Sequence, residues 1–214
     1  MSNFEIKVIF MFGTNTFYIE KDEAVQILIS VIAISLALAI SQGGFGLFTS
    51  FQGLKALTIL LALFTLTVGT GFILHEMAHK LVAIQYGAYA RFQMWTQGLL
   101  LMLALSFLGF VFAAPGAVYI YSQNISRKEN GIISVAGHVT NIVLAFVFMA
   151  LAVFAPVYTS NTNIWFIGFY VNSFLAFFNM LPIFPLDGSK VLAWNAVVWV
   201  AVTVVAGYMT FFLR

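Results

Sequence analysis

The sequence has no cysteine and very little charge. Only 7% of its 214 residues are Asp, Glu, Lys or Arg, whereas 62% are hydrophobic. The absence of cysteine excludes a disulfide framework and any thiolate metal site. The net charge of +2 offers no basic surface for nucleic acid, so we expect no nucleic-acid partner. Soluble domains of this length do not have such a composition, and the sequence therefore predicts a polytopic membrane protein in a lipid bilayer.

Apolar runs, separated by short polar or glycine-containing segments, define the expected helices. We expect spanning helices at residues 24–40, 54–83, 131–158, 164–180 and 190–213. The predicted fold is an all-α polytopic membrane protein with about five to six transmembrane helices, small interfacial β-hairpins and a re-entrant segment. All of it would form a single transmembrane domain, residues 1–214.

Two segments have features of strands instead. Residues 1–21 alternate polar and apolar side chains on both sides of a Gly-Thr-Asn-Thr turn, which predicts an interfacial hairpin. Residues 89–121 are apolar in part, but they contain several glycines, Pro115 and a β-rich end. Non-helical backbone is tolerated at membrane depth only against protein or water, so we expect a re-entrant or interfacial hairpin beside the functional site.

The candidate functional residues are the few ionisable ones within apolar runs. His75, Glu76 and His79 form the pattern His-Glu-x-x-His near the end of the second expected helix. Two histidines four residues apart share one helix face and can bind one zinc ion, which leaves room for a third ligand and a water. Glu76 is placed to accept a proton from that water. The alternative is a chance match of two core histidines, but such a pair is expensive in an apolar run unless it is functional.

Asp187 is the natural third ligand. Apart from Glu76, it is the only acid in or near an apolar run after the first expected helix. An even number of crossings must separate it from His79 if both lie at one depth, but three apolar segments lie between them, at residues 98–121, 131–158 and 164–180. We therefore expect that residues 98–121 do not span the membrane. One side would carry Lys7, Lys21, Lys80, Arg91, Arg127, Lys128 and Lys190, and the other only Lys55 and Arg214. This positive-inside pattern predicts a multi-pass cell-membrane protein with its active site toward the cytoplasm.

The motifs together resemble a known family. A His-Glu-x-x-His pattern late in a transmembrane helix, followed by Asn-x-x-Pro-x-x-Pro-Leu-Asp-Gly at residues 179–188, resembles the site-2 protease family of intramembrane zinc metalloproteases. The resemblance covers most of residues 54–190. It implies a zinc metalloendopeptidase that cleaves membrane-anchored protein substrates in or near their transmembrane segment, in regulated intramembrane proteolysis. It also implies one zinc ion on His75, His79 and Asp187, Glu76 as the general base, and no other cofactor.

Further residues match the family less closely. The stretch from Gly137 to Asn141 matches its Gly-x-x-x-Asn patch, and Asn179 opens its second motif, whereas His138 and Met180 stand where the family commonly has proline. Asn141 or Asn179 could donate to an oxyanion, although such residues often only join helices. We interpret His138 as a hydrogen-bonded neighbour of the ligands or a packing residue rather than a ligand.

Other functions fit the sequence less well. A zinc-binding membrane transporter, the main alternative, would need ligands along a path through the membrane. A prenyl-protein type membrane protease would need a Glu on another helix as its third ligand, and the chain has none in such a place. A non-catalytic scaffold would not need Glu76. The sequence identifies neither a particular transmembrane substrate nor an oligomeric state.

Overall fold

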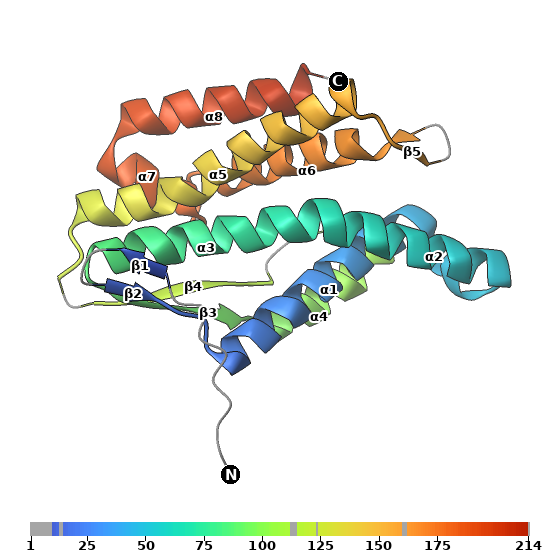
Figure 1. The fold of residues 1–214 in the computed structure, drawn as a ribbon, viewed down its shortest axis with the longest axis horizontal. Helices are drawn as coiled ribbons and strands as arrows, with labels where there is room; N and C mark the ends of the chain where they lie inside the picture. The colour runs from blue at the N-terminus through green and yellow to red at the C-terminus, as the bar shows by residue number, and fades with distance from the viewer. Residues whose placement is uncertain (1–9, 13–14, 112–114, 123, 160–161, 214) are drawn as a thin grey trace, which may run out of the picture. The chain divides into compact units, whose positions relative to one another are not determined.

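The computed structural model describes residues 10–12, 15–111, 115–122, 124–159 and 162–213 (Figure 1). These residues are mostly helical, and their helices are α1 (Lys21–Gly43), α2 (Phe51–Phe64), α3 (Thr70–Gln85), α4 (Thr96–Ser106), α5 (Arg127–Phe154), α6 (Ile164–Asn179), α7 (Asp187–Trp194) and α8 (Ala196–Phe211). The same residues form three two-stranded sheets, which are β1 (Phe10–Phe12) with β2 (Asn15–Phe17), β3 (Tyr89–Met94) with β4 (Gly116–Tyr121), and β5 (Tyr158–Thr159) with β6 (Thr162–Asn163).

Among the described residues, three helical segments are long and apolar enough to cross a membrane. They are Lys21–Phe48, Phe51–Gln85 and Arg127–Phe154. Helices α6 and α8 are also apolar, but each has 16 residues. At 1.5 Å per residue they are about 24 Å long, which is less than the hydrocarbon thickness of about 30 Å. The structure is therefore consistent with an all-α membrane protein, and a total of five to six crossings stays a prediction.

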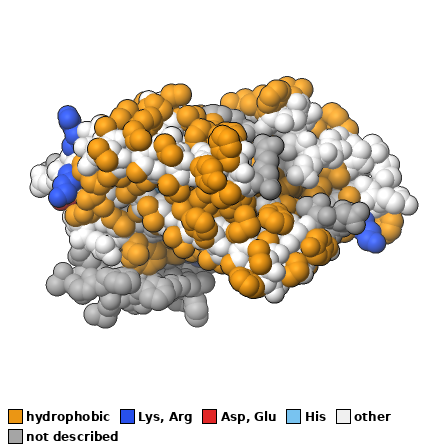
Figure 2. Space-filling model, turned by 90° about the horizontal axis from the view of Figure 1, so that it is seen from above, with side chains coloured by type: hydrophobic (Ala, Val, Ile, Leu, Met, Phe, Trp, Pro, Cys, Tyr) orange, Lys and Arg blue, Asp and Glu red, His pale blue; other side chains and the backbone are white. Residues whose placement is uncertain are grey.

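Exposed hydrophobic side chains also suggest a membrane protein. Phe154 is 85% exposed and Val197 is 78% exposed. Hydrophobic side chains cover much of the face shown in Figure 2, where charged side chains are few. Water is a poor solvent for such a surface, whereas lipid is a good one.

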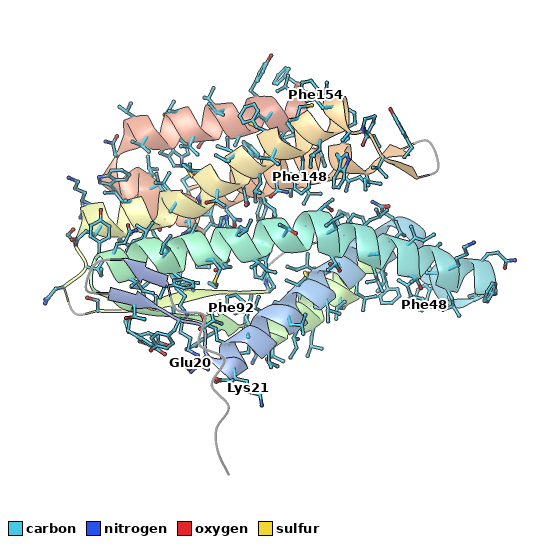
Figure 3. The ribbon with its side chains drawn as sticks, viewed as in Figure 1. Glu20, Lys21, Phe48, Phe92, Phe148 and Phe154 are labelled. Atoms are coloured by element: carbon cyan, nitrogen blue, oxygen red, sulfur yellow. The ribbon has the colours of Figure 1, made fainter. Side chains whose placement is uncertain are left out.

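The chain forms two compact units. The first contains Met1–Ile73 and Ala90–Tyr119, and the second contains Leu74–Tyr89 and Ile120–Arg214. In the first unit α1 packs against α2 and α4. In the second, α5 packs against α6 and α7, and α6 packs against α8. Phe148 on α5, labelled in Figure 3, lies so close to α6 that a Cβ at Gly168 would be 2.6 Å from its ring. Glycine at that position therefore allows α5 and α6 to approach closely.

The segment at residues 89–121 leaves the β3–β4 pair and returns to it. Its helix α4 has 11 residues, which span only about 16 Å. The backbone N–H of Trp95, at the end of β3, donates to the carbonyl oxygen of Pro115, just before β4. The two ends of residues 95–115 therefore lie beside each other.

The N-terminal part of α1 holds β3 through side chains. The carboxylate of Glu23 accepts the backbone N–H of Phe92, and the amide oxygen of Gln26 accepts that of Met94, both at 3.0 Å. Glu23 and Phe92 are completely buried, and Phe92 is labelled in Figure 3. The two N–H groups lie two residues apart and so point to the same strand edge. Side chains of α1 thus cover one edge of β3.

Several segment boundaries differ from the predictions. The expected helix at residues 190–213 is divided at Asn195, whose extended backbone ends α7 and whose Oδ1 accepts the N–H groups of Val197 and Val198. This polar cap begins a new helix inside an apolar run. Helix α5 begins before residue 131, because Ser126 and Glu129 form a capping box. Of the predicted N-terminal hairpin, residues 1–9 and 13–14 lie outside the described residues, and β1 pairs antiparallel with β2 in the rest.

Candidate metal centre

Two of the predicted ligands come from α3. His75 and His79 lie one helical turn apart, and their Nε2 atoms are 2.9 Å from each other. Both residues are buried, with exposed fractions of 5% and 6%. Nδ1 of His79 lies 2.7 Å from the carbonyl oxygen of Ile133 on α5. A carbonyl oxygen only accepts, so Nδ1 carries the proton and Nε2 of His79 keeps a lone pair for a metal.

The third predicted ligand, Asp187, begins α7. Its Oδ2 lies 3.1 Å from Nε2 of His79 and 4.0 Å from Nε2 of His75. The loop between α6 and α7 brings it there. Gly188, the second residue of α7, packs tightly against this loop, since a Cβ at that position would be 2.1 Å from the carbonyl oxygen of Met180. Trp199 on α8 donates to that same carbonyl oxygen at 2.8 Å.

These three side chains fit a zinc ion. The candidate ligand atoms are 2.9, 3.1 and 4.0 Å apart. Ligand atoms about 2.0–2.1 Å from a tetrahedral zinc are about 3.3 Å from one another, which lies within that range. Two imidazoles and one carboxylate are also a usual ligand set for catalytic zinc. The described residues contain no other such group of three His, Asp or Glu side chains.

A lysine fixes the second oxygen of the carboxylate. Nζ of Lys190 donates to Oδ1 of Asp187 at 2.8 Å, which leaves Oδ2 to face the histidines. The positive charge of Lys190 beside it favours the ionised form of the Asp187 carboxyl over the neutral one. The carboxylate is therefore ionised, as a metal ligand must be.

Gly137 on α5 forms one wall of the cluster. A Cβ there would lie 2.6 Å from Nε2 of His79 and 2.7 Å from Nε2 of His75. Any larger residue would therefore touch the two atoms that would bind the metal. The sequence marked Gly137 only as part of a family pattern, and it gave no indication of Lys190 or of the Ile133 carbonyl, since neither carries a motif.

The remaining predicted site residues lie in the same unit of the chain. Glu76 follows His75 on α3 and is 6% exposed. His138 and Asn141 on α5 are completely buried. Among the described residues, neither amide atom of Asn141 has a hydrogen-bond partner. Asn179 is the last residue of α6 and is partly exposed. The structure thus brings together His75, His79 and Asp187 as a possible metal site, while the roles of the other four stay predictions.

The chain is similar to curated proteins from two organisms. A protein of Methanocaldococcus jannaschii named "Putative zinc metalloprotease MJ0611" is 40% identical over 202 residues, which cover 92% of this chain and 97% of that protein. A protein of Bacillus subtilis named "Putative zinc metalloprotease YwhC" is 29% identical over 147 residues, which cover 59% of this chain and 66% of that protein. No family model matches the chain, and no solved structure matches it.

Proposed function

Because this chain belongs to the family of zinc metalloproteases that these relatives represent, we propose that it is an intramembrane zinc metalloendopeptidase of the site-2 protease type. It hydrolyses a peptide bond in or near the transmembrane segment of a membrane-anchored protein. One observation supports this proposal most strongly. His75 and His79 lie on a helix that is apolar and long enough to cross a membrane, and Asp187, from a distant part of the chain, lies beside them. Buried ionisable groups in such a helix favour a functional site over a structural one.

His75, His79 and Asp187 would hold one zinc ion. When bound, zinc lowers the pKa of a coordinated water and polarises the scissile carbonyl. Glu76 accepts a proton from the attacking water and returns it to the leaving amine. Asn141 supplies an amide N–H toward the oxygen that becomes negative, and Asn179 is the second candidate for that role. Asn141 is the first candidate because its buried amide has no partner among the described residues, and such a group is costly unless a ligand satisfies it.

The substrate must present an unwound backbone. A helix keeps its carbonyl groups in its own hydrogen bonds, so a transmembrane helix has to open before cleavage. We propose that the opened segment adds as a strand to the β3–β4 sheet. The Phe92 and Met94 N–H groups of β3 are bonded to α1, which favours β4 as the strand that receives the substrate. Proline substitutions along β4 should reduce cleavage while zinc content stays unchanged, and an equal loss of both would count against this idea.

The site would lie toward the cytoplasm. This proposal rests on the distribution of Lys and Arg described above. The adjacent ends of residues 95–115 support it, because an excursion that returns to its start adds no crossing. A multi-pass protein of the cell membrane would then have His79 and Asp187 near its cytoplasmic face.

A single comparison tests the proposed activity. Purified protein with zinc is incubated with single-span test proteins, and mass spectrometry identifies any cut. We expect cleavage by the wild type and none by Glu76→Gln, with zinc retained in both, because the amide cannot accept the proton. A zinc transporter would instead move the ion across vesicle membranes and leave every test protein intact.

A further inference from the structure

Trp199, a residue of α8, reaches the loop that carries the third candidate ligand. Its indole N–H donates to the carbonyl oxygen of Met180 at 2.8 Å. Helix α6 ends at Asn179, so the Met180 carbonyl lies past the hydrogen bonds of that helix. Met180 is completely buried, and water therefore does not reach this carbonyl. The indole N–H, which can only donate, satisfies an acceptor that is otherwise costly to bury.

This hydrogen bond closes a ring of the chain that contains Asp187. Met180 and Trp199 are 19 residues apart in the sequence, and between them lie the loop, α7 and the turn from α7 into α8 (Figure 1). Asn195 has an extended backbone at that turn, and its side chain caps the start of the helix on which Trp199 lies. The position of Asp187 therefore depends on how the two ends of the ring meet.

The first turn of α7 packs against the same carbonyl group. A Cβ at Gly188 would be 2.1 Å from the carbonyl oxygen of Met180 and 2.6 Å from that of Leu181. The Met180 carbonyl thus contacts both α7, at Gly188, and α8, at Trp199. Because Asp187 directly precedes Gly188, a displacement of this carbonyl would move the third ligand.

Two other contacts of α7 do not have the same effect. Lys190 orients the carboxylate of Asp187 through Oδ1, but it lies on α7 and moves with it. Helix α7 also packs against α5, where a Cβ at Gly131 would be 2.4 Å from the Cβ of Trp194. If this packing alone placed α7, Trp199 would matter only for stability. The contact at Met180 instead acts directly beside the ligand.

We propose that Trp199 is a positioning residue for the metal centre. By fixing the Met180 carbonyl, its indole N–H keeps Asp187 where Oδ2 lies 3.1 Å from Nε2 of His79. Helix α8 carries none of the three candidate ligands, yet it sets the position of one of them. The inference rests on the zinc site of the proposed function, and its test does not require proteolysis.

Two substitutions at Trp199 remove different parts of the side chain. Trp199→Phe keeps a large ring and loses the N–H group. Trp199→His loses more of the ring, but Nε2 of an imidazole is as many bonds from Cα as the indole nitrogen is, and it can donate. Trp165→Phe is the matched control, because the indole N–H of Trp165, at the other end of α6, donates to the carbonyl oxygen of Ala155 at 2.9 Å.

Each full-length chain is purified in detergent. The zinc dissociation constant is measured by chelator competition, beside the melting temperature of the metal-free protein. We expect Trp199→Phe to weaken zinc binding about tenfold, and Trp199→His and Trp165→Phe to stay within about threefold of the wild type. At residue 199 the melting temperature should fall more in the His variant than in the Phe variant, because more apolar surface is lost.

A packing role predicts a different order. Zinc affinity that falls further in Trp199→His than in Trp199→Phe, in parallel with the melting temperature, would make Trp199 a packing residue and overturn the proposal. An unchanged zinc affinity in Trp199→Phe, or an equal loss in Trp165→Phe, would also overturn it.

The activity of the protein is tested separately. If the zinc affinities follow the expected order but the wild type cuts no test protein, the proposed function fails and the role of Trp199 stands. If the wild type cuts the test protein but Trp199→Phe binds zinc as tightly as the wild type, the proposed function stands and the role of Trp199 fails.

Discussion

The backbone of Gly137 lies against the metal-facing nitrogen of His79. A Cβ at residue 137 would be 2.6 Å from that nitrogen, which is closer than real Cβ atoms approach other atoms. Gly137→Ala should therefore push the imidazoles apart and weaken zinc binding about tenfold, although no ligand is removed. Chelator competition measures the change. Gly46→Ala is the control, because nothing lies within 4 Å of a Cβ there. Equal zinc affinity in the Gly137 variant and the control would contradict the geometry of the cluster.

Gly188→Ala should displace the third ligand. The new Cβ would be 2.1 Å from the carbonyl oxygen of Met180, and backbone atoms cannot rotate away as a side chain can. Such overpacking costs about 1–3 kcal/mol or shifts the loop, and the shift would carry Asp187 with it. We expect a loss of zinc content larger than in Gly137→Ala, measured by metal analysis of the purified protein. A fully loaded Gly188 variant would show that the loop does not set the position of Asp187.

Glu23→Ala should weaken the hold of α1 on β3. The substitution leaves the buried N–H of Phe92 without an acceptor, which costs about 1–3 kcal/mol. The expected results are a lower melting temperature in detergent and faster hydrogen exchange at Phe92. The neighbouring Asp22, whose side chain is 67% exposed, provides the matched control. Asp22→Asn should change the melting temperature far less than Glu23→Ala does, because exposed ion pairs contribute little to stability.

The helices and the histidine pair are the features that the sequence predicts best. Long apolar runs and a four-residue spacing act locally, so residues 54–83 and the shared face of His75 and His79 follow from helix geometry alone. Because few acids lie near apolar runs, the sequence also indicates Asp187, and the structure places it with the histidines. Helix boundaries are less predictable where a polar side chain inside an apolar run accepts backbone N–H groups and so begins a new helix, as Asn195 does.

Contacts between distant residues had no sequence signal. The pairing of β3 with β4, the capping of β3 by Glu23 and the approach of Gly137 to the imidazoles all depend on how separate helices pack. Lys190 is three residues after Asp187, and only the structure shows that it fixes one carboxylate oxygen. Such roles depend on side-chain direction in three dimensions, which periodicity does not encode.

The proposed orientation can be tested with single cysteines, since the chain has none of its own. We expect Gln52→Cys, in the first turn of the second candidate span, to react with a membrane-impermeant maleimide in intact cells. Asn124→Cys, before α5, should react only after the membrane is opened, because the basic residues near it favour the cytoplasm. Gel-shift analysis of the labelled protein measures both. Labelling of both positions from the same side would contradict the crossing pattern.

Zinc K-edge X-ray absorption on the purified chain shows whether His75, His79 and Asp187 bind one zinc ion together. We expect one zinc per chain, with two imidazole nitrogens and oxygen ligands at about 2.0–2.2 Å, and a loss of the bound metal in Asp187→Ala. A spectrum without imidazole scattering, or a full zinc content in Asp187→Ala with the same spectrum, would show that His75, His79 and Asp187 do not hold the metal together.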